Sequence, residues 1–140
     1  MVTDVVIDTS VAAAMLFEDE VSPLATALEP IMLAGGKLIA PPLILWECTN
    51  ALRSAVLSKR LTPAKATLLL DKFCALPLEI ADPPEFRELT DLLSRAVKHQ
   101  LTTYDAAYLQ LAQGRKLPLA SHDKQLNAVA AKLGVRLFTP

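Results

Sequence analysis

Four carboxylates in this chain fall where strands are expected to end or where helices are expected to begin. Asp8 and Asp123 directly follow short apolar runs, and Glu47 and Asp105 lie in the first turns of two predicted helices. In open α/β sheets these positions meet at the carboxyl edge, where ligands bind. The order of the elements therefore predicts that all four side chains converge in one cleft.

Carboxylates that lie a few ångströms apart repel one another, and their pKa values rise unless a cation lies between them. A cluster of oxygen ligands without His or Cys favours Mg²⁺ or Mn²⁺ over Zn²⁺. An ion held there binds a phosphodiester oxygen, polarises phosphorus and activates a water for in-line attack. The cluster thus predicts metal-dependent phosphodiester chemistry, and it leaves open whether one or two ions bind.

Each of these acids also has a purely structural explanation. Asp8 can cap the helix that follows it, although Thr9 or Ser10 can do the same. Asp105 has the capping-box spacing from a preceding threonine. Glu47 is favoured by the dipole of its helix. Four acids at one predicted edge favour a shared site over four separate explanations.

Strands and helices alternate along the chain, which predicts a parallel-sheet α/β sandwich. Strands are expected at residues 5–7, 37–40, 78–81, 117–121 and 135–138. Helices are expected at residues 12–17, 22–34, 43–59, 62–76, 85–100, 102–114 and 125–133. Pro30 is expected to end or kink the second helix near Glu29. No linker divides the chain, so residues 1–140 are predicted to be a single domain.

The helical spacing of residues 85–100 predicts an amphipathic helix whose apolar side packs on the core. The core face is expected to consist of Leu89, Leu92, Leu93 and Ala96.

Composition narrows the class of protein. The 140 residues are 52% hydrophobic, which indicates a compact fold, and the net charge of −1 argues against a generally basic nucleic-acid binder. A polyanion would have to be held by local Lys and Arg side chains or by metal ions. We expect neither a membrane span nor a signal peptide, because no apolar run is long enough. Cys48 and Cys74 lack metal-ligand spacing and fit reduced, buried thiols, with a disulfide as the alternative, so we expect a cytoplasmic protein.

Four motifs, in order along essentially the whole chain, give it a family resemblance. They are Val6-Ile7-Asp8-Thr9-Ser10, Glu47 with Asn50 and Leu52, Tyr104-Asp105-Ala106-Ala107-Tyr108-Leu109, and Ser121-His122-Asp123-Lys124-Gln125-Leu126. Together they resemble the PIN-domain ribonucleases, and among these the small VapC-type toxins of prokaryotic toxin–antitoxin pairs. Each motif alone is weakly specific, whereas four in the family order form a strong signal.

The resemblance implies a PIN-like three-layer α/β/α sandwich with a central parallel sheet of order 3-2-1-4-5, flanked by about seven helices. It implies a Mg²⁺- or Mn²⁺-dependent endoribonuclease whose partners are an RNA substrate and a small antitoxin that inserts into the active-site groove. Family members usually form homodimers, so a homodimer is expected.

The resemblance also assigns roles to residues of this chain. The acidic metal-binding and catalytic residues would be Asp8, Glu47, Asp105 and Asp123. Ser10 and Ser121 would support the site with their hydroxyls, although the family often has Thr where this chain has Ser121. Asn50 shares a helix face with Glu47 and would bond either to it or to the substrate.

Some side chains near these motifs keep two interpretations. Trp46, Tyr104 and Tyr108 would either stack on a base or pack in the core or a dimer interface. His122 is expected to point away from the acids rather than to act as a general base.

Three other functions compete with this one. A phospho-receiver domain needs an acceptor Asp after a central strand and a Lys after a late strand, and the last predicted strand is not followed by a Lys. A phosphate-ester hydrolase with Asp8 as nucleophile usually needs a second Asp two residues later, where this chain has Ser10. A catalytically silent PIN-like module that binds RNA or protein stays open, although all four acids are present.

Overall fold

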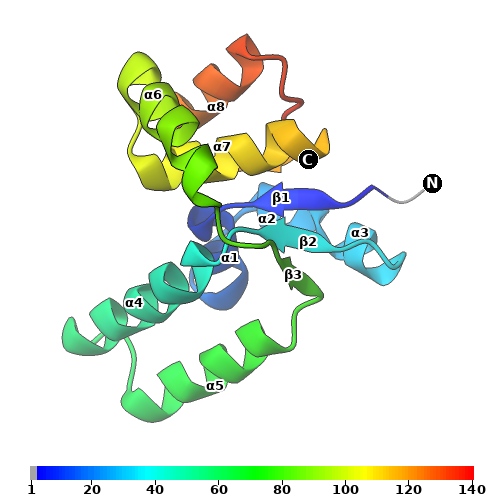
Figure 1. Cartoon of the computed structure of the whole chain (residues 1–140). Helices are drawn as coiled ribbons and strands as arrows, with labels where there is room; N and C mark the ends of the chain where they lie inside the picture. The colour runs from blue at the N-terminus through cyan, green and yellow to red at the C-terminus, as the bar shows by residue number, and fades with distance from the viewer. Residues whose placement is uncertain (1–2) are drawn as a thin grey trace.

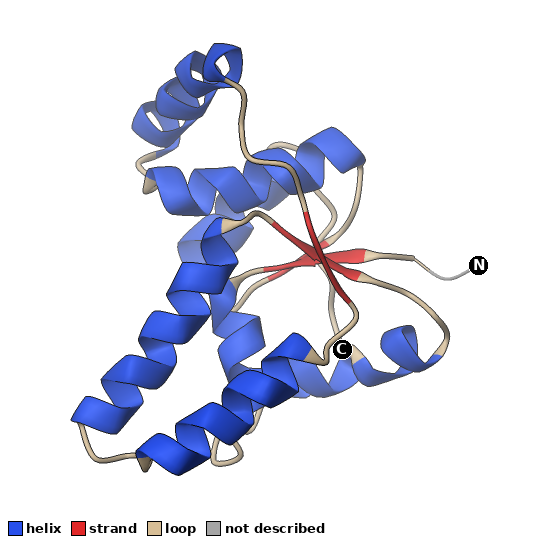
Figure 2. Ribbon diagram, turned by 60° about the horizontal axis from the view of Figure 1, so that its bottom comes forward, coloured by secondary structure: helices blue, strands red, loops and turns tan. Residues whose placement is uncertain are grey.

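The computed structural model describes residues 3–140, in which four short parallel strands form one sheet (Figure 2). The strands are β1 (Val5–Ile7), β2 (Leu38–Ala40), β3 (Leu78–Ile80) and β4 (Leu119–Ala120), in the order β3-β2-β1-β4. β1 is central, with Val6 opposite Ile39 of β2 and Leu119 of β4. The predicted parallel sheet and the order of its first four strands are confirmed.

The helices of the described residues follow the expected segments closely. They are α1 (Thr9–Leu16), α2 (Pro23–Ala27), α3 (Glu29–Leu33), α4 (Leu43–Leu57), α5 (Pro63–Cys74), α6 (Leu89–His99), α7 (Thr103–Arg115), α8 (Lys124–Lys132) and a short 3₁₀ helix at Phe86–Glu88. The segment expected at 22–34 is divided in two at Leu28, because Pro30 is tolerated only in the first turn of a new helix. This break raises the expected seven helices to eight α-helices. No helix within residues 3–140 is both long and apolar enough to cross a bilayer.

Helices cover the sheet in two groups (Figure 1). α6, α7 and α8 lie together on one side, and α4 and α5 form a hairpin that extends away on the other side, beside α1. Val5, Val6 and Ile7 of the central strand have no exposed surface, as a strand covered on both faces requires. The three-layer α/β/α fold is therefore confirmed.

The expected fifth strand at 135–138 is reduced to a single bridge. Leu137 pairs in parallel with Leu119, and the flanking bonds run from Leu119 N–H to Arg136 O and from Phe138 N–H to Leu119 O, each at 2.9 Å. The neighbouring strand β4 has only two residues before the chain turns at Ser121, so no longer ladder forms. The sheet of the described residues has four strands, and the C-terminal segment lies where the fifth was expected.

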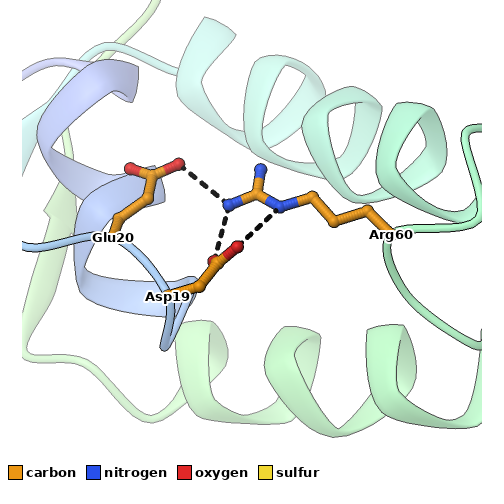
Figure 3. A network of polar contacts seen from close by, with 3 residues as sticks. All are labelled: Asp19, Glu20 and Arg60. Atoms are coloured by element: carbon orange, nitrogen blue, oxygen red, sulfur yellow. Dashed lines mark hydrogen bonds and ion pairs between the residues drawn. The ribbon is translucent and has the colours of Figure 1, made fainter.

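The α4–α5 hairpin is fixed to the segment after α1 by the side chain of Arg60 (Figure 3). Its Nη2 donates to Asp19 Oδ1 at 2.7 Å and to Glu20 Oε1 at 3.3 Å, and its Nε donates to Asp19 Oδ2 at 3.3 Å. The guanidinium carbon also lies 4.0 Å from the centroid of the Phe17 ring. These contacts hold the turn between α4 and α5 against the segment after α1.

Two expectations about buried side chains need correction. Leu89 and Leu93 of α6 are 43% and 60% exposed, and Ala96 is the buried residue of that helix. Both cysteines are free, which excludes the disulfide, but only Cys48 is buried and Cys74 is exposed.

Candidate active site

Asp8 occupies the junction between β1 and α1, at the carboxyl edge of the sheet. Its backbone N–H donates to Ala120 O of the neighbouring strand at 3.2 Å. Its Oδ1 accepts hydrogen bonds from Ser10 Oγ at 2.5 Å and from the backbone N–H of Val11 at 3.2 Å. Asp8 is therefore the N-cap of α1, and the alternative that Thr9 or Ser10 caps this helix is wrong. The bonds that cap α1 also orient the Asp8 carboxylate.

The turn after β4 brings a second group of side chains against Asp8. The buried Ser121 hydroxyl donates to Asp8 Oδ2, and the same hydroxyl accepts the backbone N–H of Asp123 at 3.0 Å. Asp123 caps α8 by accepting the N–H of Leu126 at 3.0 Å. Ser10 also accepts the backbone N–H of His122 at 3.0 Å. Ser10 and Ser121 thus connect Asp8 to the turn that carries Asp123.

Glu47 lies one turn into α4 and is held by two hydroxyls from other helices. Thr9 Oγ1 of α1 donates to Glu47 Oε1 at 2.9 Å, and Tyr108 OH of α7 donates to the same oxygen at 2.7 Å. The two hydroxyl oxygens lie 3.0 Å apart. The Tyr108 side chain is 1% exposed, and its pKa is raised mainly by burial and further by its contact with Glu47.

Asp105 lies in the first turn of α7, where its backbone N–H donates to the N-cap hydroxyl of Thr102 at 3.0 Å. Within residues 3–140 its carboxylate returns no hydrogen bond to the backbone of Thr102, so half of the expected capping box forms. Burial raises the pKa of the Asp105 carboxyl above its ordinary value, and the negative charges of the other three carboxylates raise it further. Asp105 therefore lies near enough to each of the other three acids to be affected by its charge.

The donor set suits a divalent cation of the oxygen-binding class. It consists of carboxylates, and their mutual repulsion is relieved when a cation lies among them. No three Asp, Glu, His or Cys side chains in the described part of the chain come close enough to bind one ion. Mg²⁺ commonly takes only one or two protein carboxylates and keeps several waters, so the donor chemistry fits this ion without a closed cage.

The exposed face of α4 lies beside Glu47 and is hollowed. A depression of about 390 Å³ is lined by Leu43, Trp46, Glu47, Asn50 and Tyr104, and a wider one of about 710 Å³ continues along α4 to Arg53. Asn50 is exposed, and among the described residues it makes no hydrogen bond to Glu47. Trp46 and Tyr104 are 71% and 62% exposed, which excludes a core role for both.

The sequence does not predict the roles of three residues that contribute to the site. The sequence predicts Thr9 only as a cap and Tyr108 only as a stacking or packing residue, yet both bind Glu47. Asn127 donates its amide to Ser121 O at 2.8 Å and so stabilises the turn after β4. The ring of His122 bonds to Ser22 Oγ at 2.8 Å, and within residues 3–140 it makes no hydrogen bond to the four acids. A polar residue one helical turn after a site acid, such as Tyr108 after Asp105 or Asn127 after Asp123, is the signal that could have found two of them.

The fold is shared with solved structures of low sequence identity. The structure of PAE2754 from Pyrobaculum aerophilum is 22% identical with a TM-score of 0.70 and covers 96% of this chain and 97% of that one. FitAcB from Neisseria gonorrhoeae is 17% identical with a TM-score of 0.67, covering 97% of each chain. VapC20 from Mycobacterium tuberculosis, described as a toxin that cleaves the sarcin-ricin loop, is 12% identical with a TM-score of 0.64, covering 90% of this chain and 95% of that one.

Sequence comparison adds the family. Over 93 residues the chain is 38% identical to ribonuclease VapC1 of Mycobacterium tuberculosis, in a match that covers 64% of this chain and 65% of the relative. The chain thus spans slightly less than two thirds of the length of this curated relative. A family model described as the PIN domain matches residues 5–132. The resemblance predicted from the four motifs is confirmed, and the chain belongs to the PIN-domain family.

Proposed function

We propose that this chain is a divalent-metal-dependent endoribonuclease, the toxin of a VapC-type toxin–antitoxin pair. The observation that carries the proposal is the placement of Asp8 and Asp123 at the carboxyl edge of the sheet, joined through the Ser121 hydroxyl. The raised pKa of the Asp105 carboxyl, caused by burial and then by the charges of the other acids, supports it. The similarity of the chain to ribonuclease VapC1 supports RNA as the substrate. The whole of residues 1–140 would act as one nuclease domain.

The residues have separate tasks in this proposal. Asp8, oriented by Ser10 and Ser121, and Asp105 would hold a Mg²⁺ or Mn²⁺ ion. Glu47 and Asp123 would orient the waters bound to that ion. The bound ion supplies Lewis-acid polarisation of the phosphodiester and a water activated as nucleophile. Asn50 faces the depression beside Glu47 and would contact the substrate.

The partners are proposed from the same resemblance. A small antitoxin would bind the groove beside the site, the protein would form a homodimer, and both would act in the cytoplasm. If this is right, the product of a short reading frame directly upstream stops cleavage by the purified protein.

The test is cleavage of RNA by purified protein that has been freed of antitoxin. We expect cleavage with Mg²⁺ or Mn²⁺ and none in excess EDTA. Asp8→Asn and Asp105→Asn should each lower the rate by about 100-fold or more, because each removes a charged ligand. Asp71→Asn is the matched control, since Asp71 is an exposed carboxylate on α5, and it should cleave at the wild-type rate.

Circular dichroism of each variant separates lost chemistry from lost folding. Full activity in EDTA, or equal rates for the Asp8 and Asp105 variants and wild type, would refute the mechanism. RNA binding without cleavage by the wild-type protein would instead support the catalytically silent module.

A further inference from the structure

The partly buried contact between Tyr108, Thr9 and Glu47 joins three helices that are far apart in sequence. Tyr108 and Glu47 are 61 residues apart, and Thr9 and Glu47 are 38 residues apart. α7 packs on β1, and α6 and α8 pack on α7. α4 packs on α1 and α5 on the other side of the sheet (Figure 1). The contact therefore spans the two helical layers at the edge where the acids lie.

We propose that Tyr108 and Thr9 are positioning residues that hold the Glu47 carboxylate in the orientation needed to bind the waters of the metal ion. This inference rests on the proposed function, in which Glu47 belongs to the acidic site. It assigns a task to two hydroxyls that neither cap an element nor touch the other three acids through a hydrogen bond among the described residues.

The geometry of the contact supports positioning. Both hydroxyls donate to the same oxygen, Oε1, at 2.7 and 2.9 Å. Oε2 accepts no hydrogen bond from the side chains and backbone of residues 3–140, so its lone pairs stay available for a ligand. A glutamate has three side-chain torsions, and fixing them in advance removes an entropy loss that ion binding would otherwise incur.

The burial of Tyr108 makes the contact stable. A tyrosine hydroxyl that is removed from water requires a hydrogen-bond partner. With the ring 1% exposed, the Tyr108 hydroxyl finds this partner in Glu47, with Thr9 also within reach. Hydrogen bonds to a charged acceptor are stronger than those between neutral groups. The Glu47 side chain is thus held by a rigid ring rather than by a mobile surface group.

The test measures Mn²⁺ affinity by electron paramagnetic resonance, together with kcat and KM for RNA cleavage, on the full chain. Tyr108→Phe and Thr9→Val keep the shape of each side chain and remove its hydroxyl. We expect each to weaken Mn²⁺ binding by about tenfold, the lower range for residues that orient a metal ligand, and to lower kcat more than KM rises. Thr9→Ser keeps the hydroxyl and should stay within about twofold of wild type.

A double-variant comparison tests whether the tyrosine acts through Glu47. In a Glu47→Gln background, adding Tyr108→Phe should change Mn²⁺ affinity by less than about twofold, because the group it positions is gone. Thr67→Val is the matched control for a lost threonine hydroxyl, since Thr67 is exposed on α5 and bonds only within its helix.

The outcomes separate this inference from the proposed function. Wild-type Mn²⁺ affinity in folded Tyr108→Phe and Thr9→Val, or an undiminished tyrosine effect in the Glu47→Gln background, would overturn the positioning role. A wild-type protein that cleaves no RNA would overturn the proposed function alone, because the Mn²⁺ comparison would still stand. Unfolding of Tyr108→Phe leaves the Thr9→Val and Thr9→Ser pair to decide.

Discussion

The hydroxyl of Ser121 connects the two halves of the site, so its removal should be costly. It donates to Asp8 Oδ2 and accepts the N–H of Asp123, and the residue is 4% exposed. Ser121→Ala deletes both bonds without adding volume. It leaves the Asp123 N–H without its partner and Asp8 with only the donors from Ser10 and Val11.

The expected loss of stability follows from the kinds of bond removed. A hydrogen bond to a charged acceptor contributes roughly 1.5–3 kcal/mol, and an unsatisfied buried donor costs roughly 1–3 kcal/mol. Asp8 keeps two donors and the Asp123 N–H is only partly buried, so each contribution lies near the low end of its range. We expect Ser121→Ala to lower the free energy of unfolding by about 2–3 kcal/mol.

Urea denaturation followed by circular dichroism measures this loss, provided that the m-value is unchanged. The melting temperature should fall by roughly 6–9 °C for a chain of this length. Ser94→Ala is the matched control, because Ser94 is exposed on α6, and it should stay within about 0.5 kcal/mol of wild type. A loss below about 0.5 kcal/mol for Ser121→Ala would refute the reasoning, since water would then replace the hydroxyl at no cost.

Asp105→Asn should raise the melting temperature of the metal-free protein at neutral pH, because a raised folded-state pKa means that ionisation of Asp105 destabilises the fold. The gain should vanish as the pH falls below 3.8, the ordinary value, and a gain that persists there would contradict this. Ellman's reagent should label only Cys74 in the native protein at pH 8, because burial, and then nearby negative charge, raise the pKa of Cys48 to about 12. Rapid reaction of both thiols in the native protein would refute this. Arg60→Ala should lower the melting temperature more at low salt than at high salt, as expected for loss of its exposed pairs with Asp19, and a salt-independent loss would assign the effect to packing instead.

The sequence predicted the elements well where local signals agree. β1 is a run of three β-branched residues, and Pro30 divides a helix where its missing N–H requires a new start. The prediction of a fifth strand was wrong, because a strand needs a neighbouring strand of similar length for its hydrogen bonds. The neighbour, β4, is only two residues long. Leu89 and Leu93 follow helical spacing as core residues do, but spacing alone cannot tell a face that packs internally from one that stays exposed.

The candidate site was predictable as a set of acids and not as a network. Carboxylates that follow strands can be read from a sequence, because the carboxyl ends of parallel strands share one edge. The hydrogen-bond partners of those acids lie far away in the sequence. Ser121 is 113 residues from Asp8, and Tyr108 is 61 residues from Glu47. No local sequence pattern shows which residues pair over such separations. The sequence therefore fits a packing role for Tyr108 as well as a role in the site.

The central position of β1 has a consequence for the order in which the protein becomes active during its synthesis. Asp8 leaves the ribosome early, but its partner Ser121 and the strand β4 that pairs with β1 are made more than a hundred residues later. A domain folds as a unit once its parts are present. A nascent chain that ends before β4 therefore contains Asp8, Glu47 and Asp105 without Asp123 or the hydroxyl that joins them. If the proposed function is correct, the growing polypeptide cannot attack RNA at the ribosome until β4 and Asp123 have been made.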